Sequence, residues 1–219
     1  MRALMIALPA LLWASSAAAT TDWSADAGIV SDYRFRGLTL SRGHPALQAS
    51  VTAEHSSGLY AEVWASTLGH GSDSEVDFIG GYDAEVSDHL SLDVSANWYT
   101  YPSSSDPNYV ELTGTATFTR GPATAKVEMS YVPSQGSTRS NTYVSAEGSY
   151  EIPKSPVSLT ASVGYERGWF DEVEHGGKWD WSVGGEVELK PTRLCLTYVG
   201  SNADASDRHA IVAAAFVSF

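Results

Sequence analysis

The 219-residue chain carries 26 acidic and 13 basic side chains, which gives a formal net charge of −13 at pH 7. This excess of negative charge argues against nucleic acid as a partner and against binding to an anionic lipid surface through a basic face. The single cysteine, Cys195, excludes an intramolecular disulfide.

Residues 1–19 have the pattern of a secretory signal peptide. Met1 and Arg2 precede an apolar run at 3–13 and a stretch of small residues at 14–19, and the apolar run is too short to cross a bilayer as a helix. We therefore expect export, with residues 20–219 forming one domain. The rest of the chain has no apolar stretch of 18 residues, so it could span a membrane only as a closed β-barrel.

Twelve segments alternate between apolar and polar side chains, which is typical of strands whose two faces meet different surroundings. In 46–54, for example, Leu47 and Val51 share one face while Gln48 and Glu54 share the other. The expected strands are 23–34, 46–54, 59–67, 75–86, 90–101, 109–118, 123–131, 142–150, 157–166, 179–189, 194–199 and 210–219.

The connections between these strands alternate between long and short. The long ones are 36–45, 68–74, 102–108, 132–141, 167–178 and 200–209, and the short ones are 55–58, 87–89, 119–122, 151–156 and 190–193. An even strand count with long outer loops and short periplasmic turns is typical of an outer-membrane barrel. The sequence therefore predicts an all-β fold, a twelve-stranded antiparallel transmembrane barrel built as an up-and-down meander in the bacterial outer membrane.

The apolar face of the expected strands carries no charged residue, and its large aromatic residues gather near the strand ends. This distribution favours contact with outer-membrane lipid and lipopolysaccharide over a sandwich core, whose largest side chains would lie in mid-strand. The expected girdle residues are Tyr33, Trp98, Tyr131, Tyr165, Trp179 and Tyr198 toward the long loops, and Trp23, Phe118, Tyr150 and Phe219 toward the short turns.

The last expected strand ends on Phe219, behind Val217, Ala215, Ala213 and Ile211 on the same face. A final strand that ends in an aromatic residue resembles the signal recognised by the barrel-assembly machinery. We therefore expect this machinery to bind the chain through Phe219.

The polar face of the strands would line the lumen, and it is strongly acidic. Its expected carboxylates are Asp26, Asp32, Glu54, Glu62, Glu75, Asp77, Asp83, Glu85, Asp93, Glu111, Glu128, Glu147, Glu166, Asp180, Glu186 and Glu188. Only Arg34, Arg36 and Lys126 oppose them in this register. A low-dielectric wall around water focuses this potential, which predicts a channel that passes small hydrophilic solutes and prefers cations.

The candidate constriction residues are selected from the inward-facing charges and tyrosines of this register. They are Arg34, Arg36, Tyr60, Glu62, Asp77, Asp93, Tyr99, Tyr101, Glu111, Lys126, Glu128 and Glu147. Two alternatives remain open at this point. One is a structural barrel plugged by its own side chains, and the other is a soluble periplasmic β-sandwich that binds carbohydrate through its Trp and Tyr residues.

Nothing in the sequence indicates an enzyme, a metal site or a cofactor. The sequence has no Gly-x-Ser-x-Gly motif, and no histidine has a spacing that specifies a serine and an acid as partners. His55 and His89 fall in expected periplasmic turns, while His44, His70, His175 and His209 fall in outer loops without a paired-ligand spacing for a metal.

The mature chain resembles the TorF-type porins, a family of exported bacterial proteins. The resemblance depends on Ser31-Asp32-Tyr33-Arg34-Phe35-Arg36-Gly37, on Gly58-Leu59-Tyr60-Ala61 with Val63-Trp64-Ala65-Ser66, on Glu75-Val76-Asp77 and on Tyr99-Thr100-Tyr101-Pro102. It implies a porin-like barrel and supplies no catalytic residues.

Overall fold

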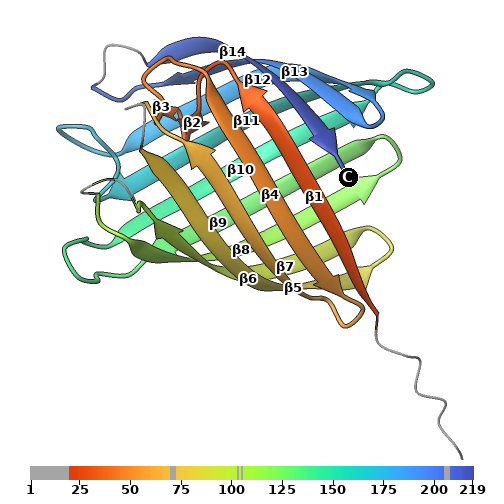
Figure 1. Ribbon diagram of the computed structural model, residues 1–219, viewed down its shortest axis with the longest axis horizontal. Helices are drawn as coiled ribbons and strands as arrows, with labels where there is room; N and C mark the ends of the chain where they lie inside the picture. The colour runs from red at the N-terminus through yellow and green to blue at the C-terminus, as the bar shows by residue number, and fades with distance from the viewer. Residues whose placement is uncertain (1–19, 70–72, 103, 105, 205–207) are drawn as a thin grey trace, which may run out of the picture.

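The computed structural model describes residues 20–69, 73–102, 104, 106–204 and 208–219. The predicted signal peptide and His70 lie outside the described residues. In the described part of the chain, twelve strands form one closed antiparallel barrel (Figure 1). These strands are β1 (Thr21–Val30), β4 (Ala46–His55), β5 (Leu59–Thr67), β6 (Ser74–Ser87), β7 (Leu90–Thr100), β8 (Tyr109–Arg120), β9 (Ala123–Val132), β10 (Asn141–Glu151), β11 (Val157–Gly168), β12 (Lys178–Leu189), β13 (Thr192–Ser201) and β14 (His209–Ser218).

The barrel closes between its first and last strands. Ile29 of β1 pairs with Ala215 of β14 on one side and with Leu47 of β4 on the other. The other strands each pair with their neighbours in chain order. The predicted twelve-stranded meander is therefore confirmed, and the β-sandwich alternative is wrong because the twelve strands form one closed sheet whose large apolar side chains are exposed.

The strand alternation separates an apolar exterior from a polar interior. Large apolar side chains stand exposed on the outer surface, with Trp23 and Ile211 each 71% exposed and Leu196 59% exposed. Their exposure is unusual for a protein in water and is expected where acyl chains replace water. No helix among the described residues is long and apolar enough to cross a bilayer.

Two strands, β13 and β1, differ most from the sequence prediction. β13 extends over Thr192–Ser201 and is longer than the expected 194–199. β1 ends at Val30 instead of continuing to residue 34, and the following segment contains a small hairpin of β2 (Arg34–Phe35) and β3 (Leu38–Thr39). In Figure 1 this hairpin lies at the end of the barrel that carries the long loops, opposite the end where the C-terminus is marked.

Tyr33 does not belong to the outer aromatic girdle, contrary to the prediction. It is buried, and its ring centroid lies 5.4 Å from that of Trp64, which faces the interior from β5. The prediction assumed that the first strand continued through residue 34, whereas the chain leaves β1 after Val30 and turns into the barrel. The other nine expected girdle residues stand on the outer face of their strands or at the C-terminus, and their role at the membrane interface remains a prediction.

Candidate functional site

Asp32 organises the segment that enters the barrel. Its Oδ1 accepts hydrogen bonds from Thr39 Oγ1 at 2.6 Å, Ser41 Oγ at 3.1 Å and the Gly43 amide at 3.1 Å. Its Oδ2 accepts one from Arg34 Nε at 2.6 Å. A buried carboxylate is stable only when such donors satisfy it, so Asp32 fixes both arms of the hairpin around itself.

The hairpin turns at Arg36-Gly37. Arg34 pairs with Thr39 and Phe35 with Leu38, which leaves two turn residues with φ of 48° and 84°. Two positive φ values define the type I′ turn that suits the twist of a two-residue hairpin. The left-handed backbone costs a residue with a side chain about 1 kcal/mol, so Arg36 occupies its position because other contacts stabilise it there.

Gly37 brings the tip of the hairpin against the wall formed by β12 and β13. A Cβ at this position would lie 2.8 Å from Ser201 Cβ and 2.9 Å from Asp180 Cβ, and real Cβ atoms do not approach so closely. Ser201 and Asp180 belong to β13 and β12. A side chain at residue 37 would therefore push the hairpin away from these strands.

Arg36 is the centre of an ion-pair network on the inner wall. Its guanidinium binds both carboxylate oxygens of Glu111, at 2.8 and 2.9 Å, and Glu166 Oε1 at 3.2 Å. Its Cζ lies 4.6 Å from the ring centroid of Phe35 and 4.1 Å from that of Tyr143. Burial alone would lower the pKa of Arg36, but Glu111 and Glu166 raise it above its ordinary value, so the side chain stays charged.

The network continues along the wall from Glu166. Its Oε2 lies 2.5 Å from Lys178 Nζ, and its Oε1 accepts a hydrogen bond from Asn141 Nδ2 at 2.9 Å. Lys178 and Glu166 are each only 1% exposed. Two cations, Arg36 and Lys178, thus balance two carboxylates, Glu111 and Glu166, at one level of the barrel.

The predicted constriction residues separate into groups along the barrel. Arg36, Tyr99 and Glu111 come together, because the Tyr99 hydroxyl donates to Glu111 Oε1 at 3.2 Å. Arg34 lies in the hairpin, Asp77 is buried on β6, and Tyr101 lines the outer cavity described below. The other candidates lie away from the Arg36–Glu111 pair. Tyr60, Glu62 and Asp93 line an inner cavity. Lys126 Nζ lies 3.7 Å from Glu128 Oε2, and Glu147 is the cross-strand partner of Lys126.

Sequence reasoning did not include four members of the network among its constriction candidates. Glu166 was on the predicted inner face but was not selected, and Tyr143 and Asn141 carried no distinguishing signal. Lys178 was assigned to a loop, one residue before the expected strand, although it begins β12 and faces inward. Its spacing of two from Asp180, an inward residue, is the signal that could have placed it.

The hairpin lines one of two cavities in the described part of the chain. The outer one, of about 920 Å³, is lined by Phe35 and Leu38 of the hairpin, by Tyr101, Tyr109 and Phe170, and by the Glu166–Lys178 pair among others. The inner one, of about 410 Å³, is lined by Thr52, Glu54, His55, Gly58, Tyr60, Glu62, Asp83 and Asp93. The two share no lining residue.

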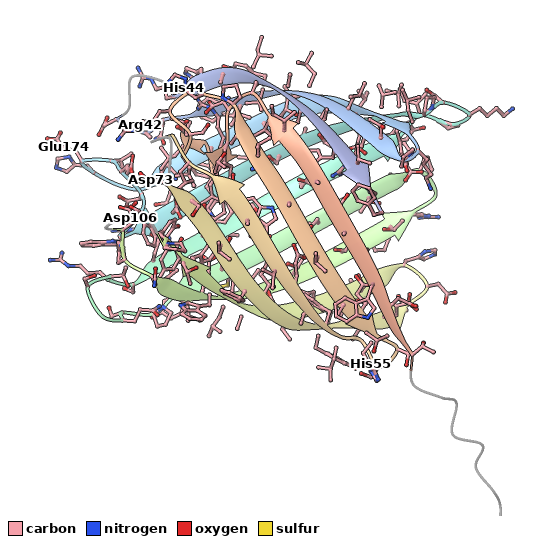
Figure 2. The ribbon with its side chains drawn as sticks, viewed as in Figure 1. Arg42, His44, His55, Asp73, Asp106 and Glu174 are labelled. Carbon is pink, nitrogen blue, oxygen red and sulfur yellow. The ribbon has the colours of Figure 1, made fainter. Side chains whose placement is uncertain are left out.

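The cavities open toward opposite ends of the barrel. Figure 2 labels Arg42, Asp73 and Asp106, which line the outer cavity, at one end and His55, which lines the inner cavity, at the other. The described residues contain no group of three or more His, Cys, Asp or Glu side chains arranged to hold a metal ion. The arrangement is that of a polar lumen narrowed by an inserted hairpin.

Asp32→Ala is expected to loosen the hairpin while leaving the barrel intact. The Gly43 amide and the hydroxyls of Thr39 and Ser41 lose their shared acceptor, at a cost of about 1–3 kcal/mol for the groups left unsatisfied. Hydrogen exchange followed by mass spectrometry should show faster exchange in peptides covering 33–44. Unchanged exchange there, with Asp88→Ala in a periplasmic turn as the control, would show that Asp32 does not organise the segment.

A closed twelve-stranded antiparallel barrel with an exposed apolar exterior and a polar interior places the protein in the class of porin-like β-barrels. A family model described as "Bacterial protein of unknown function (Gcw_chp)" matches residues 14–217, so the chain belongs to this family. A search of curated proteins found no match.

Solved structures with a similar fold include outer-membrane porins. The KdgM porin matches with a TM-score of 0.66 at 8% identity, over 90% of this chain and 99% of that chain. KdgM in complex with disordered oligogalacturonate gives 0.64 at 7% identity, over 91% and 99%, and the NanC porin gives 0.59 at 8% identity, over 90% and 98%. At these identities the likeness is one of fold.

Proposed function

We propose that the protein is a channel of the bacterial outer membrane that gives small hydrophilic solutes passive passage and prefers cations. The observation that carries the proposal is the closed barrel with exposed apolar side chains outside and polar side chains inside. The shared fold with the KdgM and NanC porins supports it, as does the sequence resemblance to the TorF-type porins.

The charge of the inner cavity supports a preference for cations. Glu54, Glu62, Asp83 and Asp93 line it, and its lining includes no Lys or Arg. Carboxylates on a low-dielectric wall raise the local concentration of cations and lower that of anions. A related fold, KdgM, has been solved with oligogalacturonate, which is an anionic oligosaccharide, and the inner cavity of this barrel would repel such a ligand.

The second candidate is a plugged structural barrel without conductance. The hairpin favours this alternative, because its contacts with β8, β11, β12 and β13 place it across the lumen. Channel and plugged barrel differ in one measurable property, the ion current through a reconstituted barrel.

The test is the current of the mature protein refolded into planar bilayers under a KCl gradient. We expect a reversal potential that shows K⁺ passing more readily than Cl⁻, and we expect Glu62→Gln with Asp93→Asn to reduce the permeability ratio about two- to threefold. Asp88→Asn, in the turn outside the cavity, removes one carboxylate and should leave the ratio unchanged. Anion preference would contradict the proposed selectivity, and absence of current would favour the plugged barrel.

A further inference from the structure

The β2–β3 hairpin contacts opposite sides of the lumen. It belongs to the connection that joins β1 to β4, and its tip at Gly37 lies against Ser201 and Asp180 on β13 and β12. From the same turn Arg36 reaches Glu111 on β8 and Glu166 on β11. These contacts place the turn across the lumen, where Phe35 and Leu38 of the hairpin also line the outer cavity.

The hairpin has little structure of its own to keep it in this position. β2 and β3 have two residues each and are joined by two cross-strand pairs, and a short isolated hairpin is marginal in water. Arg36 also adopts a left-handed backbone with φ of 48°, which is unfavourable for a residue with a side chain. Asp32 holds the two arms together, and contacts with the wall stabilise the docked position of the turn, where Arg36 makes ion pairs with two wall strands.

Arg36 also fixes the charge at this level. Its guanidinium neutralises Glu111, and it shares Glu166 with Lys178. Without Arg36, two carboxylates on the wall would face one lysine. The same side chain thus occupies the lumen and counters the negative potential of its wall.

We propose that Arg36 determines the conductance and charge selectivity of this channel by docking the β2–β3 hairpin across the lumen. The inference rests on the channel function proposed above. Removing the guanidinium frees the hairpin from β8 and β11, widens the lumen at this level and exposes Glu111. The passage then becomes wider and more selective for cations.

The test compares single-channel conductance and reversal potential of the mature barrel with those of Arg36→Ala and Arg36→Met. The methionine keeps a long side chain against Phe35 and Tyr143 and removes only the charge and hydrogen bonds. Lys154→Ala is the matched control, because Lys154 carries the same charge and has a left-handed backbone with φ of 64°, but is exposed in the turn between β10 and β11 and lines neither cavity. Heat-modifiable migration on a gel confirms that each variant folds as a barrel.

We expect both Arg36 variants to raise the conductance several-fold and to shift the reversal potential toward that of an ideal cation channel, while Lys154→Ala behaves like the parent. If all four folded proteins conduct equally with the same selectivity, the role of Arg36 is overturned and the channel function stands. The other possible outcome is that none of the four folded proteins conducts. It is resolved by a further variant, in which residues 34–39 are replaced by two glycines. If this variant is also folded and silent, both the channel function and the role of Arg36 are overturned.

Discussion

Glu166→Ala is expected to lower the free energy of unfolding by about 3–5 kcal/mol, because it breaks a buried charge network by removing one partner. Lys178 is 1% exposed and would lose the carboxylate 2.5 Å from its Nζ. Asn141 would lose the acceptor of its amide, and Arg36 would lose one of its two carboxylates. Urea titration of the refolded barrel in lipid vesicles, followed by tryptophan fluorescence, measures the change.

Two further variants test whether the lower free energy of unfolding comes from breaking the buried network or follows from removing any carboxylate. Glu166→Met with Lys178→Met removes both buried charges and should recover most of the loss, since apolar pairs often replace buried ion pairs without penalty. Glu188→Ala removes a carboxylate that is half exposed and 3.5 Å from the exposed Lys190, and an exposed pair contributes at most about 1 kcal/mol. Equal losses for Glu166→Ala and Glu188→Ala would contradict the network's contribution.

The barrel could be predicted because lipid on one side and water on the other require a pattern of side chains that is visible within each strand. A strand between lipid and a wet lumen needs apolar and polar side chains in strict alternation, and 46–54 and 157–166 show that pattern without any long-range information. The alternation of long and short connections then gives the meander. Strand ends are less certain, because pairing can continue where the apolar pattern stops, as at Gly200 and Ser201 of β13.

The hairpin could not be predicted because its position depends on residues far away in the sequence. Arg36 and Glu111 are 75 residues apart, and Arg36 and Glu166 are 130 apart, so their meeting depends on the closed barrel and its register. The four residues of β2 and β3 are too few to show a period. Arg36 could be assigned to the lumen from its charge, but neither the inward turn at Asp32 nor the burial of Tyr33 leaves a local signal.

On the exterior of the barrel, Val127→Arg is expected to lower the free energy of unfolding in lipid by about 2–4 kcal/mol. Val127 is the fifth residue of the ten in β9 and is 54% exposed on the outer face. Its cross-strand neighbours are Ala116 and Ala146, which leave room for a longer side chain. The expected loss therefore comes from placing a charge among acyl chains rather than from crowding, and the same urea titration measures it.

Thr115→Arg provides the inward-facing control for this substitution. Thr115 lies on the neighbouring strand β8, where its cross-strand partners are Asp93 and Glu128, so an arginine there meets carboxylates in the polar lumen. Because both variants add the same side chain near the middle of adjacent strands, the difference between them isolates the surroundings of the two faces. If Val127→Arg costs no more than Thr115→Arg in lipid, the outer face does not contact acyl chains, and a membrane channel built on this barrel would lose its physical basis.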